Sequence, residues 1–391
     1  MKVNKFLMLG IAGLAFAACS NEEEFGTNQT FEGNGVVSVR IATPTLTRNA
    51  GAATSGADGG TVAITGDITV TLTGTDGAGA PYQESITISA NELEPTTELK
   101  FWNIAVPSKL TASINGGQAD YSTVAIDNAS LQVAAANIPA YGETETFTKT
   151  TESDSPIIAN DGDTEAGANE GDQDKVYQMY EAKVTMAIPV ARLEVGGIYH
   201  VDEGEGCIYT ALTLNGAYLD GYCENGSVYA DGAYPNSTSP IDDYSFDGVH
   251  GTGAQSDLRD VIDPEIPFLD TNADNTVGSY TYNFYATGTN PIFKLYFENA
   301  EGTPANPVNE PRYAMVTRYQ KWNDANEDGL VDDGEMQSVT FENGHIYRIT
   351  KAELNDDNII GDEGGNTLYG VTVTVVEATW TIVDIDAEWA N

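Results

Sequence analysis

Short runs of alternating polar and apolar residues constrain the fold of this 391-residue chain more than any other feature. The pattern is clear in Val62–Gly74 (VAITGDITVTLTG) and Tyr280–Ala286 (YTYNFYA), and it recurs up to the C-terminal stretch Tyr369–Trp389. A period of two places successive side chains on opposite faces of a β-strand, and no long amphipathic helix pattern interrupts these runs. The sequence therefore predicts an all-β protein, with Asp127–Ala136 as one short helix.

Length and local composition indicate how the chain is divided. A chain of this length usually forms two domains, and the acidic, glycine-rich residues 143–174 are expected to form a surface loop. We expect a signal peptide over residues 1–18 and a propeptide with a first β-strand over residues 19–48. An N-terminal β-sandwich domain would then cover residues 49–197, and a C-terminal β-sandwich domain residues 198–391.

The apolar residues of the C-terminal stretch change parity twice. Val371, Val373 and Val375 share one face, the opposite parity begins at Val376, and the first parity returns at Val383. Because side chains alternate along a strand, each change implies a bulge or a passage between sheets. The tail is therefore expected to form two or three short strands, at least one of which could leave its own domain.

The N-terminus carries an export signal. Two lysines precede the apolar run Phe6–Ala18. This run is too short to span a bilayer, because a membrane-spanning helix needs about 20 apolar residues. The run ends in Phe16-Ala17-Ala18-Cys19, the pattern of a lipobox, so Cys19 is predicted to receive the lipid. Ordinary secretion with cleavage after Ala18 is the alternative. The acidic stretch behind Cys19 is similar to the signal that directs some Gram-negative lipoproteins to the outer leaflet.

The charge of the chain excludes two classes of partner. It contains 59 acidic and 17 basic residues, which gives a formal net charge of −42. Such a surface repels the phosphates of nucleic acids and of anionic lipid headgroups. We therefore expect no nucleic-acid partner, and contact with the membrane only through the lipid anchor of the precursor.

Two further cysteines, Cys207 and Cys223, lie in an exported chain, where disulfides form readily. Asn215-Gly216 stands between them, and this dipeptide favours a tight hairpin turn. A hairpin at that position would bring the two cysteines close together. A disulfide between Cys207 and Cys223 is therefore predicted, with two inert thiols as the alternative.

One segment has the spacing of a calcium-binding loop. The residues 324–335 (DANEDGLVDDGE) match the twelve positions of an EF-hand loop, with Gly329 at the sharp turn. The flanking residues resemble strands rather than helices, so we expect a structural Ca²⁺ site at a β-connection. An acidic turn without a metal is the alternative. The predicted ligands are Asp324, Asn326, Asp328, the backbone carbonyl of Leu330, Asp332 and Glu335.

Three further segments resemble one known family. Residues 181–193 (EAKVTMAIPVARL) are similar to its arginine-containing strand at the domain junction, and residues 344–349 (GHIYRI) to the strand before its C-terminal tail. The tail itself contains Val371–Ile382 (VTVTVVEATWTI), with Trp380 at the expected place. Together with the lipobox, these patterns resemble the fimbrillins, the major subunits of type V pili of Gram-negative bacteria. The resemblance implies transthyretin-like or fimbrillin sandwiches and a cell-surface structural subunit.

In that family a trypsin-like or Arg-specific protease removes the first strand, and the C-terminal strand of the next subunit fills the groove. The resemblance implies cleavage after Arg48, beside the flexible residues 49–61, with Arg40 as the alternative. Arg40 lies within a strand pattern, where pairing protects the backbone. The donor strand would lie within residues 371–385, unless that stretch is an ordinary core strand. Its apolar contact residues would be Val371, Val373, Val375, Trp380 and Ile382.

The implied partners are further copies of the chain, accessory pilus subunits, the processing protease, and host or bacterial surface receptors. The precursor would reside in the outer membrane and the mature subunit in an extracellular fimbrium. A monomeric surface lipoprotein that binds glycans or matrix is the alternative. We expect no enzyme, because the sequence contains no nucleophile elbow, P-loop or dinucleotide fingerprint, and its three histidines are widely separated.

Overall fold

The computed structural model describes residues 35–41, 62–89, 98–149, 179–201, 208–241, 244–248, 253–304, 307–308, 311–316, 319–322, 336–361, 373–381 and 384–386. Throughout these ranges the regular structure is β, apart from the 3₁₀ turns η2 (Ala135–Asn137) and η3 (Asp356–Asn358). The prediction of an all-β fold is confirmed. No described segment forms a helix of the length and apolarity that crossing a membrane requires.

The short helix expected over Asp127–Ala136 is not formed; this segment consists of turns that lead into η2. The side chain of Asn128 accepts hydrogen bonds from the backbone nitrogen of Ser130, at 3.0 Å, and from its hydroxyl, at 2.9 Å. Such a local turn satisfies the backbone with a side chain and competes with helix formation.

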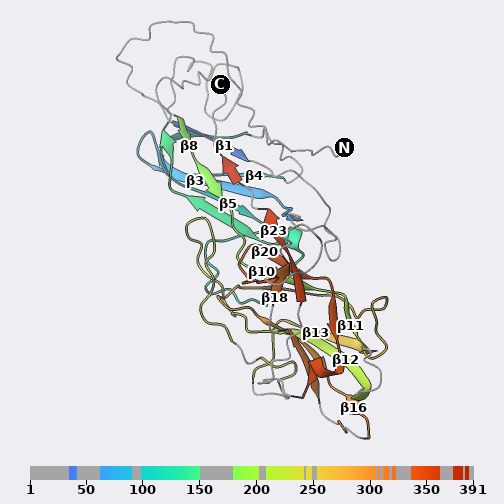
Figure 1. Ribbon diagram of the computed structural model, residues 1–391. Helices are drawn as coiled ribbons and strands as arrows, with labels where there is room; N and C mark the ends of the chain where they lie inside the picture. Colours follow the sequence, from blue (N-terminus) through green and yellow to red (C-terminus); the bar gives the residue numbers. More distant parts are fainter. Residues whose placement is uncertain are drawn as a thin grey trace, which may run out of the picture.

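The first sheet contains the first and the last described strands, β1 and β24, and lies at one end of an elongated molecule (Figure 1). Its strands follow the order β4-β3-β5-β1-β24-β9, with β6 beside β5, β8 beside β1 and β7 beside β8. Their bounds are β1 (Gly35–Ile41), β3 (Ile68–Asp76), β4 (Pro81–Ile88), β5 (Glu98–Ile114), β6 (Ala140–Thr144), β7 (Thr148–Lys149), β8 (Met179–Glu181), β9 (Lys183–Thr185) and β24 (Asp384–Asp386).

The second sheet occupies the middle of the molecule and has the order β14-β10-β20-β23-β18-β19, with β2 beside β23. Its strands are β2 (Val62–Ala63), β10 (Ala191–Val195), β14 (Tyr280–Phe284), β18 (Tyr319–Trp322), β19 (Met336–Ser338), β20 (His345–Ile349) and β23 (Val373–Thr381). β23 comes from the C-terminal stretch and is an interior strand, because it pairs with neighbours on both edges.

A third sheet and a strand pair complete the fold. The third sheet has the order β13-β12-β15-β17-β22, with β16 beside β12, and β11 pairs with β21 separately. These strands are β11 (Ile198–His200), β12 (Tyr209–Asp220), β13 (Arg259–Pro267), β15 (Ile292–Phe297), β16 (Ala300–Gly302), β17 (Arg312–Val316), β21 (Ala352–Leu354) and β22 (Ile359–Ile360).

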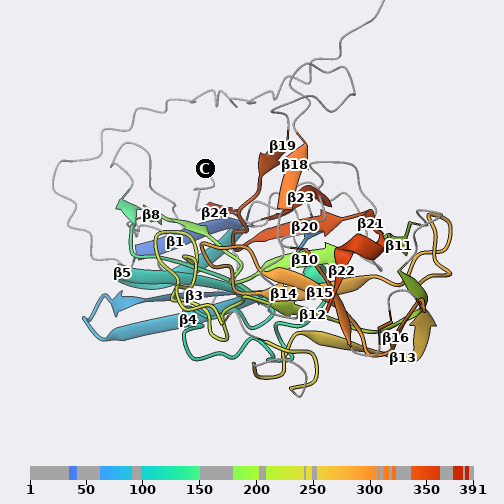
Figure 2. The ribbon, with the colours of Figure 1, turned by 60° about the horizontal axis from the view of Figure 1, so that its bottom comes forward.

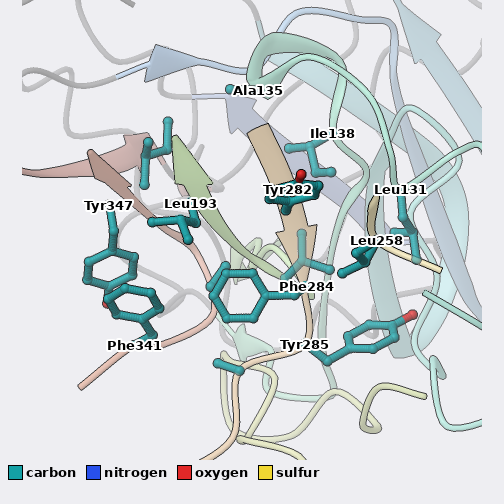
Figure 3. Close-up of a cluster of buried hydrophobic side chains, with 14 of the residues drawn as sticks. Leu131, Ala135, Ile138, Leu193, Leu258, Tyr282, Phe284, Tyr285, Phe341 and Tyr347 are labelled. Carbon is teal, nitrogen blue, oxygen red and sulfur yellow. The ribbon is translucent and has the colours of Figure 1, made fainter. Parts of the chain in front are cut away.

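The core follows the alternation in the sequence. In β3, Ile68, Val70 and Leu72 are at most 1% exposed. The threonines between them face outward, where the Thr69 hydroxyl lies 3.1 Å from the hydroxyl of Thr87. Further along the core, side chains from several strands and loops converge on the aromatic residues of β14 (Figure 3).

The sheets do not divide the chain cleanly at residue 197. β10, which precedes this point, pairs with β14 and β20 of the second sheet. β24, near the other end of the chain, pairs with β1 and β9 of the first sheet (Figure 2). The division into domains at residues 197 and 198 stays a prediction, and the strands of the two halves interleave.

The hairpin expected at Asn215-Gly216 is wrong, because β12 runs through this dipeptide without reversing. A Cβ atom on Gly216 would lie 2.0 Å from the ring of Phe246, so glycine is needed here for close approach of an aromatic ring. Cys223 is a buried free thiol, and Cys207 lies outside the described residues. Without this hairpin, the argument that brought Cys207 and Cys223 together is lost, and a disulfide between them has no support from the fold.

Candidate strand-exchange site

Strand β1 is an interior strand of the first sheet. On one edge it pairs antiparallel with β5, from Gly35 opposite Ile104 to Arg40 opposite Glu98. On its other edge it pairs in parallel with β8 and, at Arg40 and Ile41, antiparallel with β24. A short segment at the start of the described chain therefore completes the hydrogen bonding of three other strands (Figure 2).

The residues of β5 that face the core beside β1 are apolar and buried. Leu99 and Phe101, which pair with Val39 and Val37, are 7% and 0% exposed. Ile104, opposite Gly35, is 0% exposed. Loss of β1 would leave one edge of β5 without its ladder and would open the core beside these side chains. Such an edge is a template for another strand.

Of the residues predicted to be processed, Arg40 is described and the other two are not. Arg40 is inside β1 and opposite Glu98 and Asp386, so its backbone is paired on both edges, as the strand pattern predicted. Arg48 and the lipidation residue Cys19 lie outside the described residues. Cleavage after Arg48 and lipidation of Cys19 stay predictions.

The predicted donor residues Val373, Val375 and Trp380 lie in β23, while Val371 and Ile382 lie outside the described residues. β23 pairs antiparallel with β20, in parallel with β18 at its start, and in parallel with β2 at its end. In this structure the stretch is therefore a strand of the chain's own sheet, which is the alternative that the sequence left open. Exchange between copies stays a prediction.

The two parity changes in the tail have different outcomes. The register between β20 and β23 is unbroken from Val375 to Thr379, so no bulge accompanies the change at Val376. The second change, at Val383, coincides with a passage between sheets, since β23 lies in the second sheet and β24 in the first. The passage between sheets expected at Val383 is confirmed, while the departure of a strand from its own domain stays a prediction.

A buried carboxylate and two arginines lie in strands β10 and β20 of the second sheet, of which β20 pairs with β23. Glu194 of β10 is 6% exposed and lies 2.7 Å from the Nε of Arg192 and 3.0 Å from the Nε of Arg348. Arg348 is paired in register with Val376 of β23. One carboxylate thus lies between two guanidinium groups in the sheet that holds the tail, and its loss would leave two buried cations.

Hydrogen bonds join the loop residues 118–134 to β10 and to the residues in and around β14, and we call this contact the seam. The Nδ2 of Asn283, in β14, donates to the carbonyls of Leu131 at 2.6 Å and Val133 at 2.9 Å. Arg192 donates to the carbonyl of Val133 and to the Oδ1 of Asn283, both at 3.1 Å. Sequence reasoning missed this network, and its one signal is the occurrence of charged residues within apolar strand patterns such as ARLEV.

Aromatic residues reinforce the same seam. The hydroxyl of Tyr234 donates to the carbonyl of Gln118 at 2.5 Å, and that of Tyr285 donates to the carbonyl of Val124 at 3.0 Å. Tyr121 packs edge-on against Tyr234 with ring centroids 5.4 Å apart. Burial raises the pKa of Tyr121 to about 12 and that of Tyr285 above its usual value. The hydroxyl groups of these tyrosines therefore keep their protons within the seam.

The predicted calcium loop, with Asp324, Asn326, Asp328, Leu330, Asp332 and Glu335, lies outside the described residues. Its flanks are strands, as expected: β18 and β19 pair antiparallel, with Trp322 opposite Met336. The segment therefore connects the two strands of a hairpin. Among the described residues no group of three potential metal ligands occurs.

Comparisons with known proteins found similarity in structure. Neither a protein-family model nor a curated protein sequence matches this chain. A protein assigned to cell adhesion from Bacteroides eggerthii is 14% identical, with a TM-score of 0.45, over 90% of this chain and 98% of its own. A fimbrilin from Porphyromonas gingivalis is 12% identical, with a TM-score of 0.44, over 90% of this chain and 99% of its own.

The tip fimbrial protein Mfa3 of Porphyromonas gingivalis, truncated at its C-terminus, is 10% identical, with a TM-score of 0.34. The match covers 81% of this chain and 95% of that protein. The three structures named here are described as fimbrial or cell-adhesion proteins. Because identities and TM-scores are this low, we base the function on the strand pairings of the chain itself.

Proposed function

We propose that this chain is the precursor of a cell-surface fimbrial subunit that polymerises by strand exchange after its first strand is removed. The observation that carries the proposal is the position of β1, an interior strand with partners on both edges. It lies close to the start of the chain, between the lipobox and Arg48. A single cut after Arg48 would break the covalent link between β1 and the rest of the sheet that it completes.

The energetics of an empty groove favour exchange over a stable gap. Each buried N–H or C=O group of β5 that loses its partner costs about 1–3 kcal/mol. An extended segment of another copy would restore the ladder and cover Leu99 and Phe101. Contacts of this kind join subunits head to tail and do not close on themselves, so they produce a filament.

The donor in this proposal is the C-terminal stretch of a second copy. The β pattern of residues 371–385 matches what an acceptor edge requires, namely an extended segment with apolar residues at alternate positions. The lipidated precursor would be held at the outer membrane through Cys19 until a trypsin-like or Arg-specific protease cuts after Arg48. Ca²⁺ in residues 324–335 would rigidify the hairpin of β18 and β19 beside β23.

The test is limited trypsin digestion of lipid-free precursor beginning at residue 20, with N-terminal sequencing and negative-stain microscopy. We expect a new N-terminus at Asn49, followed by ladders on gels and by filaments. Arg48→Ala should remain monomeric under the same digestion, and Arg40→Ala, the matched control, should polymerise like the unaltered chain. Filaments from the Arg48→Ala precursor would show that the cut is assigned wrongly.

A peptide of residues 371–386 tests the donor. Added in excess during digestion, it should cap the open groove, co-purify with cleaved monomer and prevent filaments, while a scrambled peptide should have no effect. Cleaved monomers that neither polymerise nor retain the peptide would contradict strand exchange and favour the monomeric surface-binding lipoprotein.

A further inference from the structure

A polar cavity of about 390 Å³ lies at the seam, where residues 132–134 face β10 and β14. One side is the segment before η2, and the other is formed by β10, β14, the start of β13 and the two residues before it. It is lined by Gln132, Val133, Ala134, Arg192, Asp257, Leu258, Arg259, Asp260, Thr281, Tyr282 and Asn283. Volumes between about 300 and 1,000 Å³ are typical of sites for small molecules.

The walls of the seam cavity are fixed by hydrogen bonds. Gln132 donates from its Nε2 to the carbonyls of Ile126, at 2.9 Å, and Asn283, at 2.8 Å. Its Oε1 accepts from the backbone nitrogen of Asn283 at 3.3 Å. Together with the bonds from Asn283 and Arg192 described above, these contacts hold both walls in one arrangement. A ligand would therefore meet a preformed site.

The hydroxyl of Tyr282 is the unusual group in this site. Tyr282 is 3% exposed, and its hydroxyl forms no well-aligned hydrogen bond among the described residues, although the carboxylate of Asp260 is close enough to interact with it. Figure 3 shows the ring packed among Leu193, Leu258 and Phe284. Burial, followed by the nearby carboxylate of Asp260, raises the pKa of Tyr282 well above its usual value, so the group keeps its proton. A buried donor without a well-formed hydrogen bond destabilises the folded protein, and a ligand oxygen would relieve this.

Charges of both signs lie around the cavity. Asp257 and Asp260 are exposed acids at its rim, and Arg192 and Arg259 are half-buried bases. Arg259 donates from Nη1 to the carbonyl of Phe246 at 2.9 Å. Because Arg192 is already paired with Glu194 at 2.7 Å, a cationic ligand would meet the guanidinium group of Arg259, while an anionic ligand would meet two carboxylates and the net charge of −42 of the whole chain. The site therefore favours a neutral ligand.

The ligand must also offer both donors and acceptors. The carboxylates of Asp257 and Asp260 accept hydrogen bonds, whereas the Tyr282 hydroxyl and the guanidinium groups donate them. Small apolar surfaces of Val133, Ala134 and Leu258 lie between these groups. A neutral molecule with many hydroxyl groups and an apolar ring face combines these features.

We propose that the seam cavity binds a neutral saccharide of one or two sugar units. Asp257 and Asp260 accept hydrogen bonds from sugar hydroxyls, Arg259 donates to a sugar oxygen, and the hydroxyl of Tyr282 donates to a ligand oxygen or to the Asp260 carboxylate that orients it. This binding activity belongs to the folded subunit and does not depend on removal of β1.

The test uses the uncleaved, lipid-free precursor, so that failure of polymerisation cannot influence the result. Neutral mono- and disaccharides (glucose, galactose, mannose, lactose and maltose) are screened by saturation-transfer-difference NMR, and a binding sugar is then titrated. An array of immobilised neutral glycans separates a free sugar from a sugar displayed at a glycan terminus. Sialic acid and glucosamine serve as the anionic and cationic probes.

We expect at least one neutral sugar to bind, and Asp257→Asn and Asp260→Asn each to weaken it ten-fold or more. Asp274→Asn, an exposed acid in a turn outside the cavity, should bind normally. Tyr282→Phe keeps the packed ring, so its melting temperature should be unchanged or higher, while its affinity falls several-fold. Absence of binding by every neutral sugar, stronger binding of a charged probe, or full binding by Asp257→Asn and Asp260→Asn would each overturn the proposal.

Discussion

The buried carboxylate of Glu194 allows a direct test of how the sheet around β23 is stabilised. Glu194 lies 2.7 Å from Arg192, two residues earlier, and both side chains are at most 12% exposed. The exposed pair Lys351–Glu353 has the same sequence separation and the same distance of 2.7 Å, with side chains 62% and 49% exposed. Glu194 has a second partner in Arg348 and Glu353 a second partner in the Tyr199 hydroxyl, so each carboxylate holds two groups, and the carboxylate is buried in the first case and exposed in the second.

Glu194→Gln should lower the free energy of unfolding by about 3–5 kcal/mol, because it removes the charged partner that the guanidinium groups of Arg192 and Arg348 share. Glu353→Gln should barely move the transition, because water and salt already screen an exposed pair. Guanidinium chloride would mask charge effects, so urea denaturation followed by tryptophan fluorescence is the appropriate assay. Far-UV circular dichroism without urea establishes that each variant is folded.

Ionic strength provides the second reading of the same experiment. Raising the salt concentration to 1 M shortens the screening length to about 3 Å, which reaches exposed pairs but affects buried pairs much less. The deficit of Glu194→Gln should therefore persist at high salt. Equal, small losses for Glu194→Gln and Glu353→Gln would refute the reasoning that burial makes the Arg192–Glu194–Arg348 group important.

Three further predictions concern the first sheet and the phenols. Phe101→Ala should destabilise the precursor by about 3–5 kcal/mol in urea melts, because the ring is fully buried beside β1, and Val106→Ala, 59% exposed, should change little; similar losses would contradict the assigned core. Burial opposes ionisation of Glu143, but the Lys109 ammonium at 2.7 Å and the Tyr141 hydroxyl outweigh it and lower the pKa of Glu143 below its usual value of 4.5. The ionised carboxylate therefore stabilises the fold above pH 4.5, and this contribution is lost as the pH falls through the lowered pKa. Lys109→Met should therefore flatten the acid limb of the stability curve below about pH 5, and an unchanged limb would count against the pair. Raised phenol pKa values mean that stability is complete below about pH 10 and falls above it, so absorbance at 295 nm should rise together with unfolding, and early titration of most tyrosines would contradict their burial.

The sequence predicted the parts of the fold that depend on local periodicity. Alternation identified β3 and β14, and the parity change at Val383 anticipated the passage of the tail into another sheet. It failed where a residue acts through a distant partner. Gly216 has the local signature of a turn, but it is required by the ring of Phe246, which is 30 residues later in sequence and becomes a neighbour only after folding.

The candidate site divides in the same way. The first and last strand patterns marked β1 and β23 correctly as strands, because an extended segment is visible in the sequence. Their partners could not be predicted, since β1 pairs with residues about 60 positions later in β5 and with β24 near the opposite end of the chain. The seam cavity was also missed, because its walls come from four separate segments and no one of them has a binding motif.

The contact between β1 and β24 places the first and last described strands of one chain side by side (Figure 2). β24 is held by two residue pairs with β1 and three with β9. Under the proposed mechanism, a cut that frees β1 would also loosen the anchor of the tail in the same subunit. One proteolytic event would then prepare the molecule both to receive a neighbour and to reach for one, and uncut subunits would be inert in both directions.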